Sequence, residues 1–315
     1  MVFDKMKDVQ KNVFLAPYTT FKIGGPSKYF YIAKNTKDLI KIIKIAKKEK
    51  IAIFILGKGS NLLISDKGYD GLVIKIKLND IKVDINNKEI QIGAGVSLIN
   101  VVRNSAENSL SGIEWAINVP GTIGGAVIIN AGCFGGEMSE LIKNVKVLNI
   151  DNFEIETYSK KECNFSYRSS IFKKIKNRII LSVSLKFKNS SVEKINKKIK
   201  KIISKRIQQQ PQGISAGSFF KKVIVNDAKI IKIFKDKGGL KFENNKISAG
   251  WFIEQCGLKG KKIGGAIVSE KHANFIINTG QATAEDVIML ISLIKEKVRN
   301  KFNVQLQEEI EYIGF

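Results

Sequence analysis

Phe54-Ile-Leu-Gly57-Lys58-Gly59-Ser60-Asn61-Leu-Leu-Ile-Ser65-Asp66 is the stretch that decides the fold, and Gly71-Leu-Val-Ile74 closes it. The short apolar run of residues 51–56, in front of the glycines, predicts a fully buried strand. Gly57 and Gly59 have no Cβ, so the backbone there can adopt positive φ or approach another group closely. We therefore expect a strand, a glycine-bearing turn, a short extended piece and a second strand.

The turn itself has the features of a phosphate cradle. Ser60 and Asn61 place side-chain donors beside exposed amides, and successive amides in such a turn form an anion-binding nest. A tight strand connection without a ligand is the alternative, because short glycine patterns are weak evidence on their own. A dinucleotide fold of the Rossmann type is disfavoured, since no Gly-x-Gly-x-x-Gly opens a helix after the first strand.

A second glycine-rich stretch follows, in Val119-Pro120-Gly121-Thr122-Ile-Gly124-Gly125-Ala126 and Asn130-Ala-Gly132-Cys-Phe-Gly135-Gly136. Glycine inside an element costs about 0.5–1 kcal/mol relative to alanine, so a dense cluster needs a compensating reason. A backbone pressed against an extended cofactor is one such reason, and the two stretches would then hold the two ends of a diphosphate. A glycine-kinked sheet is the alternative.

The chain is strongly basic, with 53 Lys and Arg against 29 Asp and Glu and a formal net charge of +24. Only five of the basic residues are arginine, the type whose planar fork suits sequence-specific base contacts. We therefore expect no nucleic-acid partner. A solvated lysine-rich surface instead attracts anionic small molecules through long-range steering.

Length and composition set the remaining bounds. At 315 residues, the chain is long enough for two or three domains with substantial cores. Residues 1–12 contain no signal-peptide core, and no apolar run approaches the ~18 residues of a membrane span. The three cysteines, Cys133, Cys163 and Cys256, lack paired metal-ligand spacing and are expected to be reduced. We predict a cytoplasmic protein without a metal site or membrane contact.

Apolar periodicity predicts the other elements of the first half. A helix is expected over residues 38–50, capped by Thr36, and a hairpin over 81–94 that turns at 84–87. Ser97 is expected to cap a further helix that runs to about residue 108. Strands return between residues 145 and 187. Residues 192–210 then predict a lysine-rich helix that ends before Pro211.

The C-terminal part reads as a compact α/β module. The break at residues 208–213 is the best candidate for a domain boundary. Beyond it we expect a short helix over 249–256, a strand over 273–278 and a long helix capped by Thr283, with Val287, Leu290, Ile291 and Ile294 facing inward.

Six motifs, taken in order, resemble the UDP-N-acetylenolpyruvoylglucosamine reductase (UDP-N-acetylmuramate dehydrogenase) family, the flavoenzymes of bacterial peptidoglycan precursor synthesis. The motifs are Leu56-Gly-Lys-Gly-Ser-Asn-Leu-Leu, Val119-Pro-Gly-Thr-Ile-Gly-Gly-Ala, Tyr167-Arg-Ser, Ala216-Gly-Ser-Phe-Phe, Ala249-Gly-Trp-Phe-Ile-Glu-Gln-Cys-Gly-Leu-Lys-Gly and Glu309-Ile-Glu-Tyr-Ile-Gly. The resemblance runs from about Phe14 to Phe315. Each motif is weak alone, but six at family spacing are highly specific.

The resemblance implies an α+β fold. It predicts a two-subdomain FAD-binding unit of the vanillyl-alcohol-oxidase type, with subdomains at residues 1–78 and 79–205. An α/β substrate-binding domain at residues 206–315 follows, and its C-terminal strand returns a catalytic glutamate. The cofactor-binding residues implied for non-covalent FAD are Gly57, Lys58, Gly59, Ser60, Asn61, Pro120, Gly121, Thr122, Gly124, Gly125 and Ala126.

In such a family, NADPH reduces bound FAD. The flavin then passes a hydride to the enolpyruvyl ether of UDP-N-acetylglucosamine, and protonation completes UDP-N-acetylmuramate. The resemblance assigns the proton donor to Ser218, enolate stabilisation to Arg168 and a further catalytic contact to Glu309, with Glu308 as the fallback. A guanidinium fixed beside the developing enolate charge is chemically suited to that role.

Other site assignments are less constrained. A hydroxyl is a poor acid, so a cation is expected to assist Ser218, and the candidates are Arg206, Lys221 and Lys222. Tyr167, Arg206, Lys222 and His272 are candidate substrate contacts. The family often has Asn where Lys222 stands, which puts that one contact in question. His272 has a second interpretation, as a cap of the adjoining strand.

Two features point to different structural classes within the family. Residues 187–193 leave no room for the tyrosine-bearing loop of the longer class, yet the long segment 223–247 resembles that class. We expect a monomer. Two other functions compete: a different FAD-dependent oxidoreductase of the same fold, and a polyanion-binding protein that uses the net charge.

Overall fold

The structure is a computed structural model that describes residue 3 and residues 6–237 and 245–315. The chain forms two compact units. The first contains residues 1–13, 27–58 and 69–208, and the second contains residues 14–26, 59–68 and 209–315. The three-part division at residues 78 and 205 stays a prediction. The observed units differ from it because two short N-terminal segments join the C-terminal part of the chain.

The first unit begins with a four-stranded sheet in the order β1-β2-β5-β3, formed by Gln10–Phe14, Pro26–Ala33, Tyr69–Ile76 and Ile53–Leu56. Strands β2 and β3 both run parallel to β5. Only Leu56 of β3 is fully buried, so the expectation of a fully buried strand was wrong. The reason is its position at the edge of the sheet, where it pairs with β5 alone.

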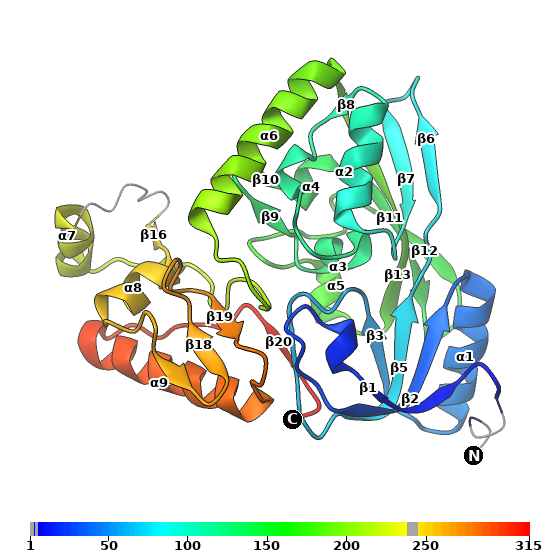
Figure 1. Ribbon diagram of the computed structural model, residues 1–315. Coiled ribbons are helices and arrows are strands. Elements are labelled where there is room, and N and C mark those ends of the chain that lie inside the picture. Colours follow the sequence, from blue (N-terminus) through cyan, green and yellow to red (C-terminus); the bar gives the residue numbers. More distant parts are fainter. Residues whose placement is uncertain (1–2, 4–5, 238–244) are drawn as a thin grey trace. The chain divides into compact units, whose positions relative to one another are not determined.

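Helix α1 (Thr36–Lys48) lies beside this sheet, as Figure 1 shows, and buries Leu39, Ile42, Ile43 and Ala46. Its cap differs from the prediction. The Asn35 side chain, and not Thr36, accepts the amide of Asp38 at 2.8 Å. Asparagine at this position satisfies one of the amides that a helix start leaves without an intrahelical partner.

A five-stranded antiparallel sheet forms the rest of the first unit. Its order is β12-β11-β13-β7-β6, from Ile155–Ser159, Ile142–Asn149, Arg178–Lys186, Glu89–Gly93 and Ile81–Asp84. Strands β6 and β7 form the predicted hairpin. Helix α2 (Leu98–Glu107) begins after Ser97, which caps it as expected. Helix α3 (Ile123–Ile128) packs against β13 and β7 (Figure 1), and α6 (Val192–Gln209) ends before Pro211 as predicted.

Short elements complete this unit and the segments around it. They are η2 (Ala16–Tyr18), β8 (Leu110–Ser111), η3 (Glu114–Ala116), β9 (Gly132–Cys133), β10 (Gly136–Glu137), α4 (Met138–Leu141), α5 (Ile171–Lys174) and β14 (Lys188–Asn189). Of these, η2 belongs to the second unit by its residues.

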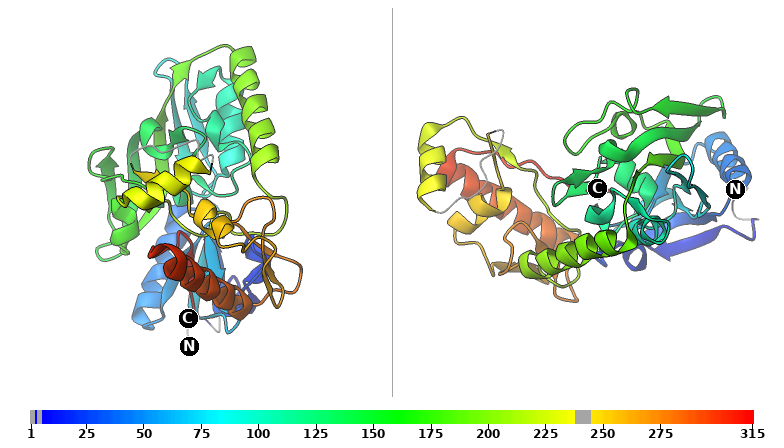
Figure 2. Two further views of the ribbon diagram at one scale, coloured as in Figure 1. Left: turned by 90° about the vertical axis from the view of Figure 1, so that its left-hand side faces the viewer. Right: turned by 90° about the horizontal axis from the view of Figure 1, so that it is seen from above.

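The second unit has a three-stranded antiparallel sheet, β17 (Lys262–Ile263), β18 (Ala266–Val268) and β19 (Ile276–Asn278). Helix α9 (Ala284–Phe302) lies along these strands (Figures 1 and 2) and buries the four predicted apolar residues. Thr283 and Asp286 form the expected capping box. The remaining elements are α7 (Ala228–Asp236), α8 (Ala249–Gln255), β15 (Val223–Ile224) and β16 (Lys246–Ile247). Part of the segment 223–247 lies outside the described residues.

The last strand, β20 (Glu311–Ile313), pairs in parallel with β4 (Leu62–Ile64), the short extended piece after the glycine turn. The carboxylate of Asp66, just beyond β4, accepts the amide of Ala284 at the start of α9 at 2.8 Å. The second half of the stretch that decides the fold, residues 59–66, is therefore anchored to both the last strand and the last helix of the second unit.

We expect Gly68→Ala to destabilise the protein by more than about 2 kcal/mol. Gly68 has φ +84°, and an added Cβ would overlap the carbonyl of Pro26, so strain of about 1–3 kcal/mol is joined by a clash with backbone. Gly257→Ala is the matched control, because Gly257 has φ +67° and open space around the added atom. Denaturant unfolding measures both variants. Equal losses would contradict the clash.

Candidate active site

The two glycine-rich stretches meet in the first unit. A Cβ added to Gly57, directly after β3, would lie 2.8 Å from the Oγ1 of Thr122. The Thr122 hydroxyl already accepts a hydrogen bond from the amide of Gly125, and it thereby caps α3. At Gly124, a Cβ would lie 2.9 Å from the Cβ of Ala94. The glycines therefore permit close backbone approach, as the sequence predicted.

The turn continues in the second unit from Gly59 onward. Gly59 has φ +62°, and a Cβ there would lie 2.6 Å from the carbonyl oxygen of Tyr18. The next residues are tied to the end of the chain. The side-chain Nδ2 of Asn61 donates to the carbonyl of Glu309 at 3.0 Å, and the backbone amide of Glu311 donates to the backbone carbonyl of Asn61 at 2.9 Å.

Two of the five arginines converge on one dipeptide of the first unit, Gly132–Cys133 in β9. Arg168 follows the Cys163–Tyr167 loop with φ +55°, and its Nη1 donates to the carbonyl of Gly132 at 2.9 Å. The Nη2 of Arg206, in α6, lies 3.3 Å from the Sγ of Cys133. The structure thus brings together Arg168 and Arg206, which the sequence listed for different roles.

Each of these two arginines also lies near an aromatic ring, and the Cys133 thiol lies near both of them. The guanidinium of Arg168 lies 5.5 Å from the ring centre of Tyr167, and that of Arg206 lies 5.0 Å from the ring centre of Phe134. Both distances are within the range of cation–π attraction. Burial raises the pKa of the Cys133 thiol, and the neighbouring Arg206 and Arg168 partly oppose that shift.

A buried carboxylate in the first unit contacts helix α6. Glu114 accepts the Ser111 hydroxyl at 2.5 Å and the Gly112 amide at 2.9 Å, and it lies 3.6 Å from the ammonium of Lys198. Arg206 comes eight residues after Lys198, about two helical turns further along α6. Sequence reasoning missed Glu114, which resembles an ordinary acidic residue.

In the second unit, Ser218 lies on an extended segment that has another segment paired on each side. Ser218 pairs with Phe275 on one side. On the other side, the amide of Glu309 donates to the carbonyl of Phe219 at 2.7 Å. The structure therefore brings the Ser218 and Glu309 segments together, and the contact from Asn61 adds the second half of the glycine turn. These three positions are far apart in the sequence.

A buried asparagine holds the serine segment. The side chain of Asn274 accepts the amide of Phe220 at 3.0 Å and donates to the same residue's carbonyl at 2.8 Å. Such two-way pairing fixes the backbone next to Ser218. Asn274 was not singled out from the sequence, where only its place after the lone histidine marks it.

The structure distinguishes Glu309 from its neighbour. Glu309 is 9% exposed, whereas Glu308 forms an ion pair with Lys295 of α9 at 2.8 Å. Adjacent residues of an extended segment point to opposite sides. This arrangement supports Glu309 over the fallback Glu308 as the site residue.

His272 and Lys222 have surroundings that do not require a ligand. The Nδ1 of His272 accepts the amide of Asn274 at 3.2 Å, and burial lowers the pKa of the imidazole. That hydrogen bond agrees with the capping interpretation. Lys222 is exposed on the segment after Phe220. Substrate contacts by these two residues stay predictions.

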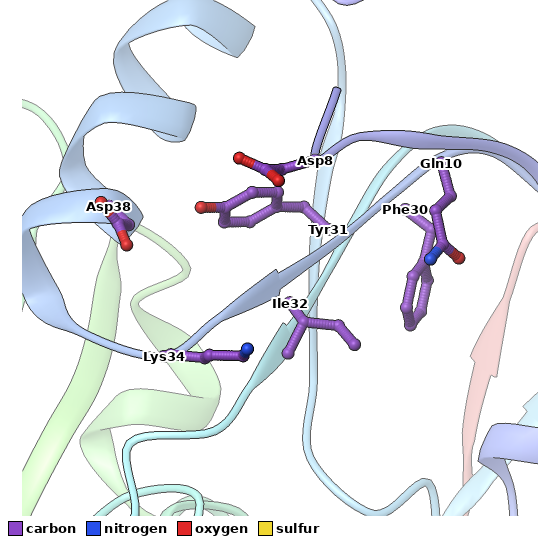
Figure 3. Close-up of a pocket in the computed structure, with 7 residues that line it drawn as sticks. All are labelled: Asp8, Gln10, Phe30, Tyr31, Ile32, Lys34 and Asp38. Carbon is purple, nitrogen blue, oxygen red and sulfur yellow. The ribbon is translucent and has the colours of Figure 1, made fainter. Parts of the chain in front are cut away.

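A pocket of about 270 Å³ lies elsewhere on the first unit, between the start of the chain, β2 and α1. Figure 3 shows Tyr31 lying between Asp8 and Asp38, and burial and both carboxylates raise the pKa of its phenol. The pocket is lined by Asp8, Gln10, Phe30, Tyr31, Ile32, Lys34 and Asp38. None of them is a predicted site residue.

Among the described residues, no group of three or more His, Cys, Asp or Glu side chains is placed to hold a metal ion. The described helices also include none with the length and apolar character needed to cross a bilayer.

Comparison with known proteins defines the class first. Residues 27–156 match the model of an FAD binding domain, and the glycine contacts above fit an extended cofactor. The protein is an FAD-dependent oxidoreductase. Residues 208–313 match the C-terminal domain of UDP-N-acetylenolpyruvoylglucosamine reductase.

Full-length relatives then specify the family. The chain is 40% identical to the UDP-N-acetylenolpyruvoylglucosamine reductase of Fervidobacterium nodosum, covering 96% of this chain and 91% of that protein. It is also 40% identical to the reductase of Caldicellulosiruptor bescii, covering 95% and 89%. The crystal structure of the Thermus caldophilus reductase matches with a TM-score of 0.77, at 30% identity over 97% of this chain and 98% of that one. The chain belongs to the UDP-N-acetylenolpyruvoylglucosamine reductase family. The resemblance and the predicted fold class are confirmed.

We expect Gly57→Ala to lower FAD affinity about tenfold, because the new Cβ competes with the Thr122 hydroxyl that caps α3. Loss of a cap alone costs about 1 kcal/mol. Titration of the apoprotein with FAD, followed by flavin fluorescence, measures the effect.

A double-mutant cycle supplies the control. In a Thr122→Ala background the added Cβ has space, so Gly57→Ala should cost much less there. The same loss in both backgrounds would show that Gly57 is needed for a reason other than its contact with Thr122.

Proposed function

We propose that the protein catalyses the reaction named by its relatives and acts in the cytoplasm as a monomer. NADPH reduces FAD, and UDP-N-acetylglucosamine enolpyruvate is reduced to UDP-N-acetylmuramate, a step of peptidoglycan precursor synthesis. FAD, when bound, accepts the hydride of NADPH and passes it to the methylene carbon of the enolpyruvyl ether. The observation that carries the proposal is the pairing of Ser218 and Glu309 on adjoining segments that also contact Asn61.

Arg168 is proposed to stabilise the negative charge of the enolate that the hydride addition creates. Its Nη1 is held by the carbonyl of Gly132, so the guanidinium is oriented before substrate arrives. Charge stabilisation by a fixed donor is strongest when no reorganisation is needed during the reaction. The left-handed backbone at Arg168 is consistent with a residue held for a functional reason.

Ser218 is proposed to protonate the carbon next to the one that accepts the hydride. The pairing with Phe275 and the clamp by Asn274 on Phe220 limit the motion of its backbone. Arg206, Lys221 and Lys222 stay the candidates for the cation that assists Ser218. The buried Glu309 is proposed to contact the substrate oxygens on which charge develops.

The proposed reaction is tested by an anaerobic absorbance scan. NADPH should bleach the flavin band, and UDP-N-acetylglucosamine enolpyruvate should restore it. Flavin that stays reduced in the presence of that substrate would favour the second candidate, a different FAD-dependent oxidoreductase of the same fold. A protein that cannot be loaded with FAD would overturn both functions.

We expect Ser218→Ala to slow flavin reoxidation by the enolpyruvyl substrate about 100- to 10,000-fold, the usual range for losing a positioned proton donor. Bleaching by NADPH should be nearly unchanged, because that half-reaction does not use the hydroxyl. Stopped-flow absorbance separates the two steps. A variant that is equally slow in both steps would contradict the assignment.

Glu309→Gln and Glu308→Gln form a matched pair on adjacent residues. The first should impair reoxidation by the substrate at least tenfold. The second should lose only the ion pair with Lys295, and a partly exposed pair of this kind contributes about 0–1 kcal/mol of stability. Comparable kinetic losses in both variants would contradict the choice of Glu309.

A further inference from the structure

A half-buried lysine lies beneath the glycine turn of the first unit. Lys75 is in β5, where it pairs with Ile32 of β2 on one side and Leu56 of β3 on the other. Its Nζ donates to the carbonyl of Gly57 at 2.9 Å. The residue was not among the cofactor-binding residues expected from the sequence. It looks there like one more lysine in a lysine-rich chain.

The hydrogen bond determines which way a peptide group points. The C=O of Gly57 and the N–H of Lys58 belong to one peptide group, and the described residues contain no cis peptide bond. In a trans peptide these two bonds point in opposite directions. Because the carbonyl is directed at Lys75, the amide of Lys58 is directed away from it. This amide is the first of the successive amides in the turn.

The surroundings of Lys75 disfavour the charged form of its side chain. Burial lowers the pKa of its ammonium, and the positive neighbours Lys77, on the same chain segment, and Lys58, after β3, lower it further. The residues paired with it on β2 and β3 are apolar. An anion bound at the turn would interact favourably with this cation, and by linkage the anion would favour the protonated lysine.

We propose that Lys75 is a positioning residue of the FAD site: it fixes the Gly57–Lys58 peptide so that the Lys58 amide faces the diphosphate, and it places a positive charge behind that amide. The proposal rests on the FAD binding of this family and extends it to a residue outside the glycine motif. A hydrogen bond to the carbonyl also polarises the peptide group and strengthens its N–H as a donor.

The test compares Lys75→Met with Lys77→Met in the apoprotein. Both variants lose one positive charge on the same chain segment, but only Lys75 contacts Gly57. Titrations with FAD, followed by flavin fluorescence, should show at least a tenfold rise in Kd for Lys75→Met and less than threefold for Lys77→Met. Equal changes in the two variants would overturn the proposal, because they would indicate a general charge effect.

Riboflavin provides a second probe, because it carries the isoalloxazine ring without the diphosphate. Its affinity should be the same in the wild type and in Lys75→Met. A parallel loss of riboflavin and FAD binding would overturn the proposal, since it would indicate a general distortion of the site. Tight FAD binding by the wild type is established in the same titrations, so failure of the cofactor assignment is distinguished from failure of this inference.

The pH dependence provides a third readout. The protonated lysine favours the anion, so the Kd for FAD should rise as the pH increases from neutrality toward about 10.4, the ordinary lysine value. The rise should begin below that value, because the pKa of Lys75 is lowered. It should be smaller in Lys75→Met than in Lys77→Met, because only the second variant keeps the titrating group of Lys75. A rise of the same size in both variants would overturn the assignment to this residue.

Discussion

The structure depends on a turn that has room for backbone but not for side chains. At Gly57 an added Cβ would press on Thr122, and at Gly59 it would press on the carbonyl of Tyr18. These two contacts lie in different units, yet the residues are two positions apart in the chain. Within each unit the contact keeps the main chain of the turn close to its neighbours, and main-chain amides are the groups that an extended phosphate-bearing cofactor binds.

Within each unit, hydrogen bonds to backbone carbonyls and amides orient the segments that carry the predicted catalytic residues. The carbonyl of Gly132 accepts a hydrogen bond from the Arg168 guanidinium, and the carbonyl of Phe219 accepts one from the Glu309 amide. The Asn274 side chain hydrogen-bonds both the amide and the carbonyl of Phe220. Backbone partners are independent of side-chain rotamers, so they fix position with little conformational freedom. A site organised in this way tolerates sequence change around it, provided that the short extended segments keep their pairing.

The sequence was informative where a pattern has a local cause. The capping of α2 by Ser97 and of α9 by Thr283, and the end of α6 before Pro211, follow from side chains near the helix ends. One failure came from tertiary pairing, because β3 is an edge strand despite its apolar run. The other was local, because both Asn35 and Thr36 are residue types that cap helices and the cap is Asn35. The motifs suggested Arg168, Ser218 and Glu309, whose roles stay predictions. They did not reveal Glu114, Asn274 or Lys75, because each of these residues contacts a residue on another element, namely Lys198, Phe220 and Gly57.

Arginine and lysine occupy different kinds of position in this protein because their side chains differ in hydration and shape. Arg168 and Arg206 contact one dipeptide, and Arg178 pairs with Glu156 at 2.6 Å. A weakly hydrated planar fork suits such fixed, partly buried positions. Lysine supplies most of the +24 charge, and at the surface it attracts anions over long range without specific geometry. Lys75 differs from the surface lysines because it is half-buried and its hydrogen-bond partner is a carbonyl of the glycine turn. Its position beneath the turn, rather than its charge alone, is what makes it a candidate for a specific role.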